Sequence, residues 1–257
     1  NFVVFGSHLP PLRSWLAQFA LPSVLAIGAT YAALWLTQRS ALRQEISKDA
    51  HLPDLSRGAC IAALGIGATA AALLLASAFG LQLGLVTFVA AAITLAVVLL
   101  RNREAPFGIL KRVSWGVLPL VAGLFVLVEG LQQTGVIDTL SQLLRAASDR
   151  SVVATAWGAG ILVTIAGNLL NNLPAGLIAG SAVSVAHVSP QVTGAILVGV
   201  DLGPNLSVTG SLATILWLVA LRREGLHVTA WTFLRVGVIA MPPALLLALG
   251  GIAILHR

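Results

Sequence analysis

Long apolar segments, separated by short loops that hold most of the basic residues, constrain this chain more than any other feature. The clearest are segments 15–37, 58–78, 84–100, 113–128 and 233–255. Each approaches the length of about 20 apolar residues that a helix needs to cross a bilayer. Only 9% of the 257 residues are charged, against about 25% in soluble domains. The pattern predicts an all-α, polytopic protein in a lipid bilayer.

Basic residues predict the orientation of these segments. Two apolar segments separate the loop that holds Lys48 from the loop that holds Lys111, and a third basic loop follows around Arg223. All three loops are therefore expected on one side, which the positive-inside rule places in the cytoplasm. The same rule accounts for the net charge of +6, so we expect no nucleic acid as a partner. The amphipathic segment 134–149 is expected to lie flat in the outer interface.

An asparagine cluster interrupts the apolar segment 152–188. Asn168, Asn171 and Asn172 precede Pro174, which suits the first turn of a new helix. The apolar arms on either side are each near a dozen residues, short of a full span, so we predict a re-entrant hairpin. Amides next to a helix N-terminus can hold a neutral polyhydroxyl solute, an anion or a cation. The alternative is a polar loop that joins two ordinary spans.

A second interruption divides segment 190–221 and predicts a broken helix. Gly203 and Pro204 end its first half, directly after Asp201. A carboxylate at membrane depth is costly and by default functional, which makes Asp201 a candidate proton-coupling residue. The alternative is that Asp201 only caps a half-helix or pairs with a buried base. The candidate substrate-binding residues from both interruptions are Asn168, Asn171, Asn172, Asn205, Thr209 and Ser211.

Other residues are weaker candidates. Glu129 ends an apolar run and suits an interfacial position better than a proton relay. Cys60 is the only cysteine, so one chain can build neither a disulfide framework nor a thiolate metal site. The histidines are scattered, and no nucleophile, phosphate-loop or metalloprotease motif occurs. We therefore expect no metal, no cofactor and no enzymatic activity.

Three stretches of the chain resemble the bacterial arsenite/antimonite efflux permeases of the ion-transporter superfamily. They are Trp115–Gly135, with Val128-Glu129-Gly130-Leu131; Asn168–Pro174; and Gly199–Gly225, with Gly199-Val200-Asp201-Leu202-Gly203-Pro204-Asn205 and Arg222-Arg223-Glu224-Gly225. The resemblance implies two inverted repeats, each with a re-entrant hairpin and a broken helix. It also implies export of arsenite and antimonite, as neutral trihydroxides, from the bacterial cytoplasm across the inner membrane in exchange for protons. It leaves room for a soluble ATPase subunit and for a homodimer.

This chain has one hairpin and one broken helix, so we expect it to hold the second repeat of such a transporter. Residues 1–14 are interpreted as the tail of an upstream segment, 15–112 as scaffold spans and 113–257 as the transport region. The alternative function is a sodium- or proton-coupled anion transporter of the same superfamily. A different class, an inert membrane scaffold or an enzyme subunit, predicts no metalloid binding and tolerance to changes at Asn171.

Overall fold

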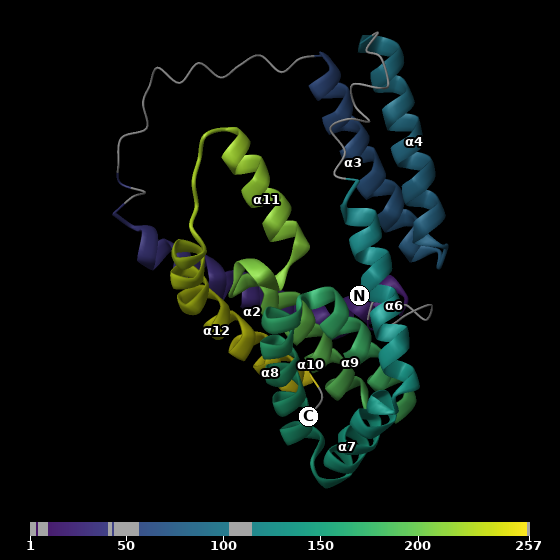
Figure 1. Cartoon of the computed structure of the whole chain (residues 1–257), viewed down its shortest axis with the longest axis vertical. Helices are drawn as coiled ribbons and strands as arrows, with labels where there is room; N and C mark the ends of the chain where they lie inside the picture. Colours follow the sequence, from purple (N-terminus) through teal and green to yellow (C-terminus); the bar gives the residue numbers. More distant parts are fainter. Residues whose placement is uncertain (1–3, 5–9, 41–42, 44–56, 103–114, 256–257) are drawn as a thin grey trace. The chain divides into compact units, whose positions relative to one another are not determined.

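A computed structural model describes residues 4, 10–40, 43, 57–102 and 115–255, and these residues are helical without a strand (Figure 1). Five of the described helices are long and apolar enough to cross a membrane. Large apolar side chains such as Leu64 and Phe88 are 75% and 72% exposed, as lipid-facing side chains are. The prediction of an all-α, polytopic membrane protein is confirmed. Lys48 and Lys111 lie outside the described residues.

Two helices form a unit of their own. α3 (Arg57–Ala78) and α4 (Leu83–Asn102) pack against each other within it. Gly80 ends α3 in the left-handed conformation (φ 67°), and the Leu81 amide donates to the Ala76 carbonyl at 2.9 Å. This is the Schellman arrangement, which closes a helix end with a backbone hydrogen bond. The tight turn reverses the chain between two apolar helices.

The remaining elements belong mainly to the other unit, which includes α2 from Trp15 onward and the chain from Leu120 onward. Its elements are α2 (Leu12–Gln38), α6 (Val117–Gln133), α7 (Val136–Arg150), α8 (Val152–Leu170), α9 (Asn172–Ala186), α10 (Pro190–Leu202), the 3-10 turns η2 (Gly203–Asn205) and η3 (Val208–Gly210), α11 (Leu212–Arg223) and α12 (Ala230–Leu255). α2 therefore packs with the later helices.

α10 is the centre of this unit. It packs against α8, α9 and α12, and its side chains are buried from Gln191 to Val200 except at Thr193. Val192 has no exposed surface at all. Phe19 of α2 completes the core around it. A short helix that is apolar on every face can be stable only when neighbours cover all of its sides, which α10 achieves.

α8 and α10 approach closely because small residues recur every four positions on both helices. Gly160, Thr164 and Asn168 share one face of α8, and Gly199 and Gly203 share one face of the α10 end. A Cβ atom at Gly199 would overlap the Gly160 carbonyl oxygen, and one at Gly203 would lie 2.9 Å from Thr164 Cα. Small residues let membrane helices bring their backbones into contact. This contact brings the polar ends of both helices together.

α7 is amphipathic and braces α9. It follows α6 after a bend of 72° at Gly135, whose φ is 77°. The Arg145 guanidinium donates to the Val185 and Ala186 carbonyls, each at 3.1 Å. These carbonyls end α9, where a cation interacts favourably with the helix dipole. The helix predicted at 134–149 is present, and its place in the outer interface stays a prediction.

Two local details differ from the predictions. α8 has 19 residues and meets the length of a full span, so the first arm is longer than the expected dozen. The reason is that Asn168 continues the helix and the break comes later, at Asn171. α12 begins at Ala230, three residues before the predicted start at 233.

Candidate solute site at the two helix breaks

The two polar interruptions of the sequence meet in space. Turns η2 and η3, which follow α10, both pack against α8 and against each other. α12 also contacts both turns. A Cβ atom at Gly237 of α12 would lie 2.6 Å from the carbonyl oxygens of Asn205 and Leu206. The glycine therefore lets α12 close over the backbone of the second break.

Asn168 ties the first interruption to the second. Its Nδ2 donates to the Thr164 carbonyl at 2.8 Å and to the Gly203 carbonyl at 2.7 Å. Its Oδ1 accepts a hydrogen bond of 2.8 Å from the Ser207 hydroxyl. A primary amide has two N–H donors, and both are used here. Asn168 therefore holds the end of α10 against α8, and its donors are not available to a solute.

Ser207 and Thr209 place two hydroxyls beside Asn168. The Thr209 hydroxyl donates to the Asn168 carbonyl at 3.0 Å. The Ser207 and Thr209 oxygens are 3.2 Å apart. Ser207 is half-buried and Thr209 is exposed, so this pair lies at an accessible surface of the break.

Asn171 forms the break between α8 and α9. Its backbone has φ 83° and ψ 148°, a combination that residues other than glycine rarely adopt and that costs about 1–3 kcal/mol. Its Nδ2 donates to the Thr209 carbonyl at 3.0 Å, and its Oδ1 accepts from the Leu173 amide at 3.3 Å. The side chain thus caps α9 and binds the second break.

The other predicted substrate-binding residues differ in their surroundings. Asn172 begins α9, is half-buried, and its amide forms no hydrogen bond with the part of the chain that the structure describes. Asn205 is exposed in η2, and its side chain likewise has no hydrogen-bond partner among the described residues. Ser211 accepts from the Ala213 amide at 3.2 Å and is the N-cap of α11. Ser211 therefore has a capping contact, whereas the side-chain amides of Asn172 and Asn205 remain available for hydrogen bonds to a solute.

Asp201 does not face this cluster. It lies two residues from both Gly199 and Gly203, which rotates it by about 200° on a helix, away from α8. Instead it lines a cavity of about 80 Å³ with uncharged residues of α2, α10 and α12. Trp15, Phe19 and Ser23 of α2 are among them. Asp201 lies inside the last turn of α10 while Ser211 caps α11, so Asp201 does not cap the second half-helix.

The remaining candidates lie apart from the breaks. Glu129 is exposed on α6 and Cys60 is exposed on α3. The described residues contain no cluster of three His, Cys, Asp or Glu side chains that could hold a metal ion. Sequence reasoning missed Thr164, whose hydroxyl donates to the Gly160 carbonyl at 2.8 Å and lies 3.3 Å from the Gly199 carbonyl. Its four-residue spacing from Gly160 and Asn168 was the available signal.

The geometry joins an asparagine-rich helix end to a broken helix, the feature on which the sequence resemblance rested. The sequence profile of a family described as arsenical pump membrane protein matches residues 55–256 of the chain. The chain belongs to this family. Membership confirms the resemblance stated above. No solved structure matches the chain significantly.

Two of the curated relatives described next are themselves named arsenical pump membrane proteins. The chain is 27% identical over 179 residues to an arsenical pump membrane protein of Escherichia coli, covering 68% of this chain and 42% of that protein. It is 30% identical over 150 residues to one from E. coli strain K12, covering 57% of this chain and 35% of that protein. It is also 30% identical over 149 residues to an uncharacterized transporter of Mycobacterium tuberculosis. This match covers 54% of this chain and 34% of that protein. The chain spans between 34% and 42% of the length of these relatives.

Proposed function

We propose that this chain forms the transport region of a secondary transporter that exports arsenite and antimonite from a bacterial cytoplasm in exchange for protons. The observation that carries the proposal is the meeting of two helix breaks around Asn168, in a chain of the arsenical pump membrane protein family. Helix breaks at membrane depth are tolerated where they line a cavity or are buried in protein, and in transporters they mark binding sites.

The chemistry of the cluster suits a neutral solute. Its polar groups are amides, hydroxyls and backbone carbonyls, from Asn168, Asn171, Ser207 and Thr209. Asp201, the only carboxylate between Asp149 and Glu224, is on the other face of α10. A neutral trihydroxide exchanges hydrogen bonds with water for hydrogen bonds with such groups at little cost, whereas an ion would need a counter-charge. Arsenite and antimonite as trihydroxides meet this requirement.

Asp201 is the residue proposed to couple export to protons. It lines a small cavity whose other lining residues are uncharged, between α2, α10 and α12. It is also joined to the cluster through the α10 backbone, because Gly203, two residues later, accepts the hydrogen bond from Asn168. Protonation in the cavity can thus change the position of the break without contact between proton and solute. This arrangement predicts separate sites for the two transported species.

The test is metalloid uptake into inside-out vesicles from a strain that lacks its own exporters and expresses the full chain. An imposed proton gradient, acidic inside, is expected to drive accumulation of arsenite and antimonite. Replacing sodium with potassium is expected to change nothing. Uptake that follows the sodium gradient instead would favour the sodium-coupled alternative, and no uptake under either gradient would reject the proposal.

Two variants refine this measurement. Asp201→Asn keeps the shape of the side chain but cannot titrate, so it should retain metalloid exchange without a gradient and lose uphill accumulation. Ser23→Ala, which changes the same cavity without removing its carboxylate, is the matched control and should accumulate normally. Wild-type accumulation by Asp201→Asn would remove Asp201 from the coupling step, with Glu129 as the next carboxylate to test.

A further inference from the structure

The amide orientation of Asn168 is fixed by its surroundings. One end of the amide lies 2.8 Å from the Thr164 carbonyl and 2.7 Å from the Gly203 carbonyl. Both of these groups only accept hydrogen bonds, so the NH₂ end must face them. The oxygen end therefore faces Ser207, and at 2.8 Å the Ser207 hydroxyl must be the donor. The hydroxyl hydrogen of Ser207 is therefore used in the hydrogen bond to Asn168 Oδ1.

The hydroxyl hydrogen of Thr209 is also used in a hydrogen bond to Asn168. Its hydroxyl oxygen lies 3.0 Å from the backbone carbonyl oxygen of Asn168, which can only accept a hydrogen bond. A hydroxyl has one hydrogen and two lone pairs. The Ser207 and Thr209 oxygens are 3.2 Å apart, but neither has a hydrogen left for the other. Both hydroxyl oxygens therefore keep lone pairs that can accept, and Thr209 is exposed.

We propose that Ser207 and Thr209 form a paired acceptor that selects solutes carrying O–H groups, and so admits the protonated trihydroxide while rejecting oxyanions. A solute O–H that approaches the pair donates to one or both oxygens. An oxyanion such as arsenate also carries O–H groups near neutral pH, but its negative charge would lie against oxygen lone pairs, and Asn168 has no N–H donor left to stabilise that charge. The pair therefore favours a neutral solute that carries O–H groups.

A monovalent cation is the competing occupant of two oxygen lone pairs. The described residues around the pair argue against it, because they supply amides and carbonyls but no carboxylate. Asp201 lines the cavity on the other face of α10. A cation here would bring a charge that no described carboxylate around the pair neutralises, whereas a neutral O–H donor needs no counter-charge.

This inference rests on the proposed function and deepens it. Its test is the concentration dependence of arsenite uptake into inside-out vesicles. Thr209→Val keeps the side-chain shape and removes the oxygen, so KM should rise about tenfold, the loss expected for one hydrogen bond. The maximal rate per folded transporter should stay near the wild-type value. Thr209→Ser keeps the oxygen and should restore the wild-type KM.

Thr155→Val is the matched control. The Thr155 hydroxyl also donates to a backbone carbonyl, that of Ser151 at 2.8 Å, but it lies at the opposite end of α8. Its KM should be unchanged. A lower maximal rate with unchanged KM in Thr209→Val would mean that the hydroxyl only holds the break together, which overturns the inference. A higher sodium requirement with unchanged arsenite KM would overturn it in favour of a cation site.

A solute series on the wild-type protein tests the same idea without mutation, and decides it if Thr209→Val does not fold. Methylarsonous and dimethylarsinous acids replace one and two of the hydroxyls of arsenite by methyl groups. The half-saturation concentration should rise with each replacement, and arsenate should not compete. Equal affinity along the series, or competition by arsenate, would contradict the paired acceptor while the export function stands. If the wild-type protein takes up no metalloid, both proposals fail.

Discussion

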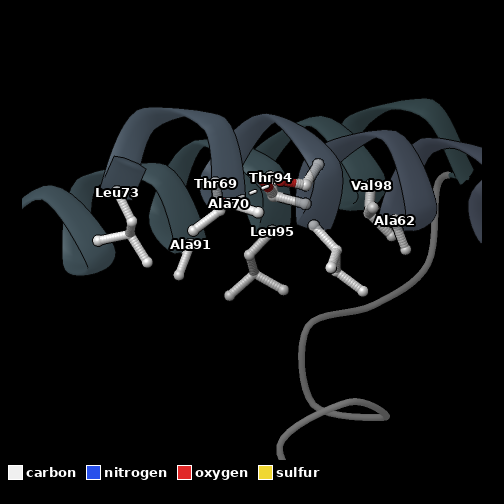
Figure 2. A pocket seen from close by; sticks show the side chains of 10 residues that line it. Ala62, Thr69, Ala70, Leu73, Ala91, Thr94, Leu95 and Val98 are labelled. Carbon is white, nitrogen blue, oxygen red and sulfur yellow. Dashed lines mark hydrogen bonds between the residues drawn. The ribbon is translucent and has the colours of Figure 1, made fainter. Parts of the chain in front are cut away.

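The α8–α10 contact and the α3–α4 contact bring helices together in the same way but use their polar groups differently. In the α3–α4 pair, a Cβ at Gly65 would overlap the Thr94 side chain, so a glycine again permits close approach. An apolar groove of about 590 Å³ runs along this pair. Figure 2 shows side chains that line it, Thr69 and Thr94 among them. Their hydroxyls donate to carbonyls of their own helices, at 2.7 and 2.8 Å.

In the α8–α10 contact, polar groups reach across to the other helix. Thr164 lies within 3.3 Å of the Gly199 carbonyl, and Asn168 donates to the Gly203 carbonyl. A polar group that bonds its own helix leaves the neighbour free to slide, whereas one that bonds the neighbour fixes its position. Small residues therefore create the close contact, and the direction of the hydrogen bonds decides whether it can hold a precise site.

The largest expected effect comes from filling the backbone contact of α8 and α10. Gly199→Ala places a methyl group against the Gly160 carbonyl, which cannot rotate away. We expect a loss of at least about 3 kcal/mol in the free energy of unfolding, at the upper end of overpacking effects. Unfolding in mixed micelles of increasing SDS content measures it.

Gly65→Ala is the comparison for this first prediction, because its methyl group meets a side chain that can move. Gly65→Ala should lower the free energy of unfolding by about 1–2 kcal/mol. Gly158→Ala, with no atom within 4 Å of its Cβ, should be neutral. Equal losses at Gly199 and Gly65 would mean that the two contacts are not different in kind.

The next effect is the loss of the cross-helix hydrogen bonds. Asn168→Leu keeps the side-chain volume but removes bonds to Thr164, Gly203 and Ser207. At about 1 kcal/mol for each bond, unfolding should be easier by about 2–3 kcal/mol. Hydrogen exchange should also increase at the amides of η2 and η3. An unchanged exchange pattern would show that Asn168 does not hold the break.

A smaller effect on stability is expected at Asn171, the residue with positive φ at the α8–α9 break, which is compared here with Gly80 at the α3–α4 turn. Gly80 and Asn171 both have positive φ values, 67° and 83°, but only Gly80 is free of backbone strain. Asn171→Gly should therefore be more stable than Asn171→Ala by about 1 kcal/mol, since both lose the amide and only alanine keeps the strain. Thermal unfolding in detergent compares the pair, and equal midpoints would argue against strain at this position.

The smallest effect is expected in the groove. Thr69→Val removes a hydroxyl that bonds only its own helix, to the Gly65 carbonyl. Because that carbonyl keeps its helical partner, stability should change by no more than about 0.5 kcal/mol. A loss as large as that of Asn168→Leu would mean that hydroxyls in the α3–α4 pair also fix the contact.

The apolar spans and the two breaks could be predicted from sequence because each is a local signal. About twenty consecutive apolar residues have the length of a span, and a Gly-Pro pair such as Gly203-Pro204 favours the end of a helix. The side on which Asp201 lies could not be predicted from local sequence. It depends on α2, about 180 residues earlier in the chain, because Trp15 and Phe19 of α2 line the same cavity as Asp201. The hydrogen-bond roles of Ser207 and Asn168 were hidden for the same reason, since their partners lie 35 to 39 residues apart.

The end of α8 shows a second limit. Three asparagines in five residues indicate a polar break, but only Asn171 leaves the helix. Asn168 stays helical because α10 supplies the Gly203 carbonyl that its amide needs. Sequence alone located the cluster to within a few residues and could not say which amides are structural and which remain available.

The position of bound antimony tests the central claim most directly. Crystals of the full chain soaked with antimonite should show anomalous difference density next to the Ser207 and Thr209 hydroxyls. The density should be lost in Thr209→Val and kept in Asp201→Asn, because Asp201 lines a different cavity. Antimony bound only in the Asp201 cavity, or only at Cys60, would contradict a solute site at the two helix breaks.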